Sequence, residues 1–288
     1  MPIEVVHYTD PGCPWAYSAE PFVRALEWRY GDGLAWRTVM IGLAEDPQLY
    51  IDRGYTGTQM TQWHIEFRDR LGMPYATAPR ERPAATGLAC RLVVSARRQG
   101  HEAADALLRA LRFSWFTDPR PHDRMDVLEP IVRSVAGIDH AAVLAGLDDP
   151  AVEEAYLADR RASRTILAPA SAQGKTANTD GEERYTAPSL TFERDGRMLV
   201  AAGWQPLAAY DVCIANLAPE LPQRAPAGPE QTLPAFPRGL TTFEVAVLAA
   251  DRNDEPDRVK AEESLIALAA EGRAERVALG SDALWLPV

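Results

Sequence analysis

The order of apolar and polar positions along the chain predicts a β-α-β opening. Residues 3–8 are mostly apolar and β-branched, and they end in turn-forming residues at positions 9–12, as in a buried strand followed by a loop. From Pro14 onward the apolar residues recur on one face at helical spacing. A second strand is expected at residues 34–41. Cys13 therefore stands at the N-terminus of the first helix.

The middle of the chain, roughly residues 58–170, is almost entirely helical in pattern. The candidate helices, punctuated by glycines, are residues 84–98, 101–115, 125–136 and 150–167. Strand patterns return only at residues 189–193 and 197–202, two short apolar runs on either side of the turn sequence Arg-Asp-Gly, which predicts a β-hairpin. Another helix is expected at residues 206–217.

The C-terminal part follows a proline-rich stretch at residues 219–238, which we interpret as an extended linker. Beyond it, Thr241 and Thr242 are expected to cap a helix that runs through Leu248. A second helix at residues 259–270 and a hairpin at residues 273–286 complete a module that resembles a small winged helix. Glu244, like other acidic residues of these helices, is interpreted as part of a solvated face. The acidic balance of the module favours a packing or dimerisation role over DNA binding.

Composition narrows the classes of function. The net charge of -11 disfavours general binding to nucleic acids or anionic membranes, so neither is expected as a partner. The chain's histidines are scattered without ligand spacing, so no metal site is expected. Three cysteines, Cys13, Cys90 and Cys213, cannot form a disulfide framework and fit a reducing compartment. Because neither a signal-peptide pattern nor a membrane-spanning run is visible, we expect a cytoplasmic protein.

Two motifs carry a resemblance to a known family. The sequence DPGCPW at residues 10–15 matches an Asp-Pro-x-Cys-Pro-Trp type motif, and TAPSLTF at residues 186–192, followed by Gly196 and Gly203, matches a cis-proline strand and its hairpin. The chain resembles the thioredoxin-like DsbA family, particularly its cytoplasmic branch, over about residues 1–218. The resemblance implies an α/β thioredoxin-like fold with an inserted helical domain.

The resulting division of the chain has four parts. They are a thioredoxin-like domain at residues 1–57 and 171–218, a helical insertion at 58–170, the proline-rich linker at 219–238, and a winged-helix-like α+β module at 239–288.

Cys13 is the candidate catalytic residue. The thiolate is the reactive form of cysteine, and a helix N-terminus stabilises negative charge, so a loop-exposed Cys13 with a lowered pKa is expected. Pro14 suits the first turn of the helix, where its missing N–H is not needed, and Trp15 can pack against a substrate. Pro21 predicts a kink or break in the same helix.

The second half of the candidate site comes from the resemblance. It implies a cis bond before Pro188, with this proline facing Cys13. It also implies that the backbone of Thr186 and Ala187 pairs with an extended substrate. The predicted substrate-binding residues are therefore Pro14, Trp15, Thr186, Ala187 and Pro188.

Ala16 occupies the position at which a Cys-x-x-Cys site has its second thiol. A mixed disulfide at Cys13 lacks this internal resolving group, and Cys90 and Cys213 lie in apolar helical patterns typical of core residues. We therefore expect a DsbA-like thiol-disulfide oxidoreductase with one cysteine nucleophile and no tightly bound cofactor. A low-molecular-weight thiol such as glutathione is the candidate resolving partner. The expected substrates are protein or small-molecule thiols or disulfides, and a homodimer is an open alternative to the monomer.

Two other functions remain open. The first is a thiol-cofactor-dependent isomerase or transferase of the hydroxychromene-carboxylate isomerase or kappa glutathione transferase type. Related proteins of those types have serine at the cysteine position, which Cys13 does not match. The second is a non-catalytic adaptor that binds a protein through the same groove.

Overall fold

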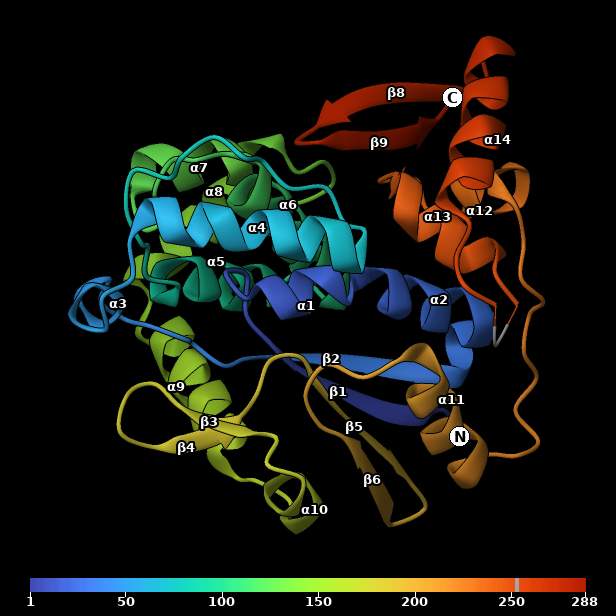
Figure 1. Cartoon of the computed structure of the whole chain (residues 1–288). Helices are drawn as coiled ribbons and strands as arrows, with labels where there is room; N and C mark the ends of the chain where they lie inside the picture. The colour runs from blue at the N-terminus through green and yellow to red at the C-terminus, as the bar shows by residue number, and fades with distance from the viewer. Residues whose placement is uncertain (252–253) are drawn as a thin grey trace.

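The computed structural model describes residues 1–251 and 254–288 (Figure 1). Strand β1 (Ile3–Thr9) is followed by helices α1 (Pro14–Ser18) and α2 (Glu20–Tyr30), a 3-10 turn (Gly31–Gly33) and strand β2 (Leu34–Met40). The two strands pair in parallel, which confirms the β-α-β opening. The predicted break also occurs, because the helix is interrupted at Ala19 and restarts with Pro21 in its first turn.

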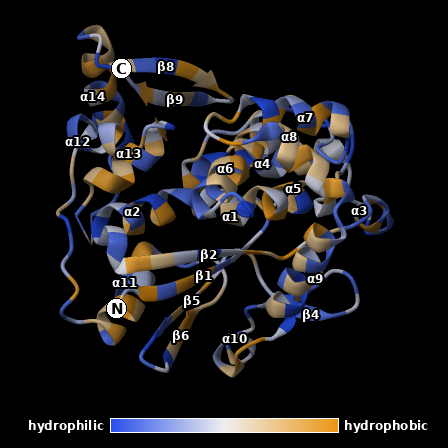
Figure 2. Cartoon of the chain, turned by 180° about the vertical axis from the view of Figure 1, so that it is seen from behind, coloured by the Kyte–Doolittle hydropathy of each residue, from blue (hydrophilic) through white to orange (hydrophobic). Residues whose placement is uncertain are grey.

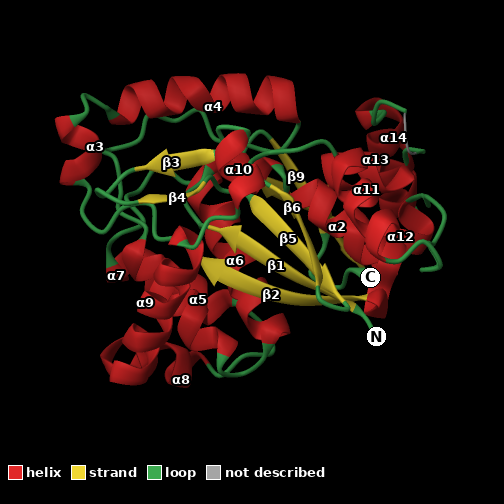
Figure 3. Ribbon diagram, turned by 90° about the horizontal axis from the view of Figure 1, so that it is seen from below, coloured by secondary structure: helices red, strands yellow, loops and turns green. Residues whose placement is uncertain are grey.

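The central sheet has four strands in the order β2-β1-β5-β6, which Figure 3 shows side by side. Strand β5 (Ser189–Arg194) runs antiparallel to β1 and forms the predicted hairpin with β6 (Arg197–Ala201). Helix α11 (Leu207–Leu217) then packs its buried residues Tyr210 and Ile214 against β5. A β-α-β unit and a β-β-α unit in one mixed sheet make a thioredoxin-like fold, as expected.

Along the sequence, a helical region separates strands β1 and β2 of the central sheet from strands β5 and β6. Its elements are α3 (Gln48–Asp52), α4 (Gly57–Leu71), α5 (Gly87–Arg97), α6 (His101–Thr117), α7 (Met125–Ser134), α8 (His140–Ala145), a 3-10 turn (Gly146–Asp148), α9 (Pro150–Arg164) and α10 (Ala168–Ala172). Leu107, Leu111 and Trp115 of α6 are at the centre of its core, which also takes in Tyr17 from α1 and Met40 from β2. The insertion therefore packs directly on the helix that follows Cys13.

One hairpin was not predicted. Strands β3 (Thr176–Asn178) and β4 (Glu183–Tyr185) pair with each other and form a separate two-stranded sheet. The prediction that strands return only at residue 189 was wrong, because these strands are only three residues long and largely polar. In Figure 2, β4 is mostly hydrophilic, whereas β1 is mostly apolar. A periodicity of two over three polar residues leaves no signal.

The C-terminal module has the helix-helix-hairpin order that the pattern predicts. It consists of α13 (Thr242–Ala249), α14 (Arg258–Ala270), β8 (Ala274–Leu279) and β9 (Asp282–Pro287), with a short strand β7 (Leu240–Thr241) that completes the sheet order β7-β9-β8. Thr241 forms a capping box with Glu244, so the predicted N-terminus of the helix is confirmed.

The stretch at residues 219–238 is not wholly an extended linker, and that prediction was wrong in part. Helix α12 (Pro229–Ala235) lies within it, because Pro229 takes a first-turn position where proline is tolerated. The part before this helix is fixed to α2, since the indole N–H of Trp28 donates to the carbonyl of Ala225 over 2.8 Å. The backbone N–H of Arg224 donates to the carbonyl of Arg29. Proline content alone did not reveal these contacts.

Glu244 is fully buried, so its assignment to a solvated face was wrong. Its carboxylate accepts two hydrogen bonds from the guanidinium of Arg109 on α6, at 2.6 and 2.8 Å. A buried carboxylate needs such a partner, since an unpaired buried charge is strongly destabilising. This ion pair joins the C-terminal module to the helical insertion.

In the described ranges, no helix is both long and apolar enough to cross a membrane.

Candidate thiol site

Cys13 is the N-cap residue of α1, and the fold places it beside the loop that precedes β5. Its backbone is extended, with φ −87° and ψ 115°, and Pro14 takes the first helical position. The Ala187–Pro188 peptide bond is cis. The thiol of Cys13 donates a hydrogen bond to the carbonyl oxygen of Ala187 over 3.3 Å. The structure therefore brings together the two motifs that the sequence places 174 positions apart.

The environment of Cys13 differs from the expected exposed thiolate. Cys13 is only 5% exposed and packs with Ile41 and Ala187. Burial raises the pKa of Cys13 to about 11, although the backbone N–H groups of Ala16 and Trp15 act in the opposite direction. Helix α1 has five residues, so its dipole is short, and desolvation outweighs it. At neutral pH the residue is a protonated thiol in this conformation.

Trp15 is the exposed part of the motif. Its side chain is 41% exposed and meets Phe67 of α4 edge to face, with 4.9 Å between the ring centroids. The ring centroid of Trp204, which follows β6, lies 6.3 Å from that of Trp15. Pro14 is half-buried. The indole of Trp15 therefore offers an apolar contact at the edge of the site, between the insertion and the thioredoxin-like sheet.

The backbone of Thr186 is hydrogen-bonded within the chain. Its N–H donates to the carbonyl of Lys175 over 3.2 Å, and its own carbonyl accepts a hydrogen bond from the hydroxyl of Ser189. In this conformation both groups take part in internal hydrogen bonds, and the pairing of Thr186 with an extended substrate stays a prediction. The carbonyl of Ala187 is likewise engaged by the thiol of Cys13.

Asp10 is a buried carboxylate that sequence analysis did not assign to the site. It accepts hydrogen bonds from the backbone N–H groups of Gly12 and Leu43, at 2.8 and 2.9 Å, and from the hydroxyl of Thr86 at 2.9 Å. The thiol of Cys90 lies 3.5 Å away. Asp10 thus holds the loop before Cys13 against the loop after β2. An aspartate directly after a buried strand was the available signal.

Arg184 and Tyr50 interact electrostatically with Cys13, and neither was predicted. The guanidinium of Arg184 is buried and donates to the carbonyl of Tyr185 and the hydroxyl of Thr179. Within residues 1–251 and 254–288, it has no carboxylate partner at hydrogen-bond distance. Its charge lowers the pKa of Cys13, against the larger effect of burial. Burial raises the pKa of Tyr50, and the charges of Asp10 and Cys13 act in the same direction.

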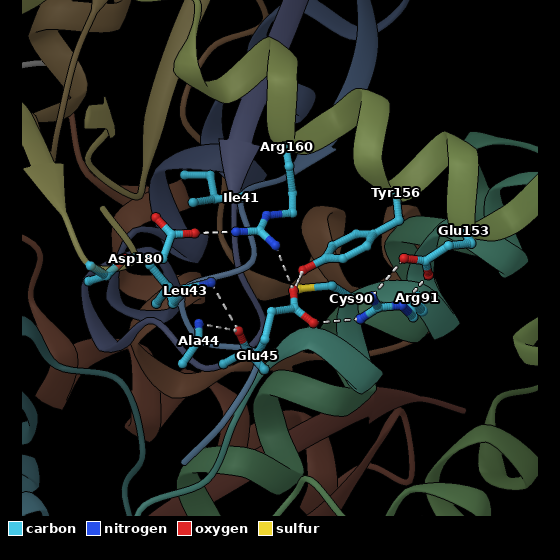
Figure 4. Close-up of polar contacts among 12 residues, drawn as sticks. Ile41, Leu43, Ala44, Glu45, Cys90, Arg91, Glu153, Tyr156, Arg160 and Asp180 are labelled. Atoms are coloured by element: carbon cyan, nitrogen blue, oxygen red, sulfur yellow. Dashed lines mark hydrogen bonds and ion pairs between the residues drawn. The ribbon is translucent and has the colours of Figure 1, made fainter. Parts of the chain in front are cut away.

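A charged network fixes the two loops that flank this site to the insertion (Figure 4). Figure 4 shows the guanidinium of Arg160, on α9, between Asp180 of the β3–β4 turn and Glu45 of the loop after β2. The hydroxyl of Tyr156 also donates to Glu45, and Arg91 on α5 donates to the same carboxylate over 2.9 Å. The insertion therefore determines the separation of the loop after β2, which begins at Ile41, and the β3–β4 hairpin, which carries Arg184.

Cys13 has no second thiol at the end of its motif that could resolve a mixed disulfide. All three cysteines are free, and Ala16 is buried directly after Trp15. Cys90 is fully buried, as expected of a core residue, whereas Cys213 on α11 is half-buried. In the part of the chain that the structure describes, no group of three or more His, Cys, Asp and Glu side chains is arranged to hold a metal ion.

Comparison with solved structures establishes the fold. Three similar structures are a candidate protein disulfide isomerase from Nitrosomonas europaea, the cytosolic disulfide reductase DsbM from Pseudomonas aeruginosa, and a candidate DsbA oxidoreductase from Streptomyces coelicolor. Their TM-scores are 0.57, 0.53 and 0.55, at 17%, 19% and 22% identity. The chain has the thioredoxin-like fold of DsbA-type proteins.

The similarity to these three structures does not extend over the whole chain. The similarity covers 75–78% of this chain and 92–98% of the other three, so about a quarter of this chain has no counterpart in them. Protein-family models and curated protein sequences give no match.

Proposed function

We propose that the chain is a thiol-disulfide exchange protein that works through the single thiol of Cys13. One observation carries the proposal: the thiol at the N-cap of α1 lies 3.3 Å from the carbonyl oxygen of the cis Ala187–Pro188 peptide bond. In this position a substrate disulfide admitted to the site meets both the sulfur and the flanking backbone. Two structures of similar fold are named as a disulfide reductase and a candidate disulfide isomerase, and DsbM from Pseudomonas aeruginosa has also been solved with glutathione.

The proposed reaction has two exchange steps. Cys13 loses its proton as its sulfur attacks one sulfur of the substrate disulfide. The S–S bond breaks, and the departing sulfur leaves as a thiol after taking up a proton. A low-molecular-weight thiol such as glutathione then attacks the mixed disulfide. It regenerates the Cys13 thiol and leaves the substrate's other sulfur in a mixed disulfide with the small thiol. Ala16 makes this external thiol necessary.

The raised pKa of Cys13 limits the conformations of the site in which the exchange reaction can take place. A thiol with a pKa of about 11 reacts poorly, because the thiolate is the nucleophile. Exchange therefore requires the loops around Ile41 and Ala187 to part and admit water or substrate. Once Cys13 is hydrated, the N–H groups of α1 and the charge of Arg184 are no longer opposed by burial, and they favour the thiolate.

The same burial favours a second candidate function, a thiol-cofactor-dependent isomerase or transferase. A cysteine that stays protonated is a hydrogen-bond donor, and such a donor stabilises the thiolate of a bound cofactor instead of attacking a disulfide. In that case Cys13 turns its S–H from Ala187 to the cofactor's sulfur. The chain would then bind a small thiol reversibly and form no lasting disulfide with it.

Intact-mass analysis after incubation with glutathione disulfide separates these functions. Thiol-disulfide exchange predicts one glutathione adduct on the wild type, reversed by added glutathione, and no adduct on Cys13→Ala. Cys213→Ala is the matched control because it removes a half-buried thiol outside the site, and it should behave like the wild type. Saturable glutathione binding in calorimetry without an adduct supports the cofactor function instead. Absence of both an adduct and binding contradicts both functions and favours the adaptor.

A further inference from the structure

A cavity of about 550 Å³ lies away from the thiol site, where α2, β2 and α6 meet the segment that leads into the C-terminal module. Its volume is within the range of small-molecule binding pockets. The residues that line it include neither Cys13 nor any residue of the loop before β5. One wall, formed by Arg224 and residues 235–239, comes from beyond α11, so this cavity is not a feature of the thioredoxin-like sheet alone.

The apolar part of the cavity is aromatic. Trp28 of α2, Trp36 of β2 and Phe236 contribute to its lining. Trp28 is held in place by its hydrogen bond to Ala225 and is covered by the guanidinium of Arg224, 5.3 Å from the ring centroid. Trp36 is half-buried, and among the described residues its ring meets no other aromatic ring. A planar ligand can therefore stack on Trp36, which large aromatic side chains favour by both area and geometry.

The charged groups of the cavity fall into two sets. Arg24, one of the lining residues, is paired internally, since it donates to Glu27 over 2.6 Å and to Asp105 over 2.9 Å. Arg109 is likewise paired, with the buried Glu244. These contacts hold α2, α6 and α13 together, so they shape the cavity and leave neither of these two guanidinium groups unpaired for a ligand.

The second set consists of exposed groups at the rim, Arg224 and Arg238 on one hand and Asp32 and Glu102 on the other. Within the described ranges, none of the four forms an ion pair, although all of them line one cavity. Two guanidinium groups and two carboxylates that do not pair with one another offer complementary charges of both signs. A ligand with an anionic and a cationic group satisfies both, through charge-assisted hydrogen bonds.

We propose that this cavity binds a small zwitterionic molecule with an aromatic ring, of the amino-acid type. The ring stacks on Trp36, the ligand's anionic group contacts the rim guanidinium groups of Arg224 and Arg238, and its cationic group contacts Asp32 or Glu102. This binding is independent of the chemistry at Cys13, and it needs the C-terminal segment that supplies Arg224, Phe236 and Arg238.

Calorimetry on the full chain with three indole probes tests the proposal. L-Tryptophan carries both charges, indole-3-propionate only the anion, and tryptamine only the cation. We expect saturable binding of L-tryptophan, with each single-charge probe weaker by about tenfold or more, since losing one charge-assisted hydrogen bond costs roughly 1.5–3 kcal/mol. Equal or tighter binding of either single-charge probe, or no saturable binding of any probe, overturns the proposal.

Variants at the rim provide the matched comparison. Arg238→Gln should weaken L-tryptophan and indole-3-propionate and leave tryptamine unchanged, whereas the double variant Asp32→Asn with Glu102→Gln should weaken L-tryptophan and tryptamine only. Arg273→Gln is the control because Arg273 is an exposed arginine outside the cavity, paired with Glu271. Cys13→Ala should bind L-tryptophan like the wild type. If Arg238→Gln and Arg273→Gln bind L-tryptophan equally, the assignment of the rim is wrong. Since both positions are exposed, loss of folding does not confuse this comparison.

Discussion

The thiol of Cys13 points at the carbonyl oxygen of Ala187, 3.3 Å away, and donates to it. A thiolate at that position faces the negative end of a carbonyl dipole, so the contact stabilises the protonated form only. Together with burial, it keeps Cys13 in a protonated and covered form. Under the proposed function, exchange at Cys13 requires movement of the loop that carries Ala187 and Pro188.

The first prediction concerns the pH dependence of Cys13 alkylation. With a pKa of about 11, the thiolate fraction at pH 7 is on the order of 10⁻⁴. We expect alkylation by iodoacetamide in the Cys213→Ala background to be slow at pH 7 and still rising between pH 9 and 11. Peptide mapping with mass detection gives the rate at Cys13. A profile that levels off near pH 8.5, the ordinary thiol value, contradicts the protonated and covered form of Cys13.

The second prediction concerns Arg184, whose buried charge acts on Cys13. Replacing it by glutamine removes that charge and should raise the pKa of Cys13 further. A shift of one unit slows alkylation at pH 9 by about tenfold. Arg184→Lys keeps the charge and should retain most of the rate. The measurement is the same mass-detected alkylation, with thermal unfolding to verify that each variant is folded.

Arg53→Gln is the matched control for Arg184. Arg53 donates to the carbonyl of Thr179 over 2.9 Å, so it contacts the same β3–β4 turn, but it is exposed. If Arg53→Gln slows alkylation as much as Arg184→Gln does, the effect comes from the conformation of the turn and not from the charge beside Cys13.

The sequence was sufficient to predict the β-α-β opening, the β5–β6 hairpin and the location of Cys13 at the N-terminus of α1. These features depend on local signals that survive without partners: the apolar run of β1, the proline after Cys13, and the capping residues of α13. The break before Pro21 is of the same kind, since it follows from the backbone chemistry of one residue.

The environment of the thiol was not predictable in this way, because it depends on segments far apart in the chain. Ile41 and Ala187 bury Cys13, and the charge of Arg184 acts on it from a hairpin that is too short and too polar to recognise. Glu244 was misassigned for the same reason. A glutamate on a helix is usually solvated, and only the approach of Arg109 from the insertion makes its burial possible.

The third prediction concerns the buried ion pair of Arg109 and Glu244. Removing one partner leaves an uncompensated buried charge, so Arg109→Met should lower the free energy of unfolding by about 3–5 kcal/mol. The double variant Arg109→Met with Glu244→Leu should recover most of this loss, because neither charge remains buried. Urea unfolding, followed by tryptophan fluorescence, measures both. A double variant that is as unstable as the single one contradicts the charge argument.

The same pair has a pH signature. Burial acts to raise the pKa of Glu244, but the charge and hydrogen bonds of Arg109 outweigh it and lower the pKa overall. The stabilisation is therefore present above the unfolded pKa of a glutamate, about 4.3, and is lost as the pH falls through the folded value. Between pH 5 and pH 3, the wild type should lose more stability than Glu244→Gln. Parallel curves for the two proteins contradict this assignment.

The last prediction restores a second thiol at the end of the Cys-Pro-Trp motif. Ala16 is buried in the first turn of α1, three positions after Cys13. In Ala16→Cys the new thiol can attack a mixed disulfide at Cys13, form the internal disulfide and release the small thiol without an external partner. We expect the glutathione adduct of the wild type to persist until glutathione is added, and that of Ala16→Cys to disappear unaided. Ala16→Ser, which has nearly the same size but no thiol, should keep the adduct. An adduct that persists equally in all three proteins contradicts the view that Ala16 limits the chemistry of this site.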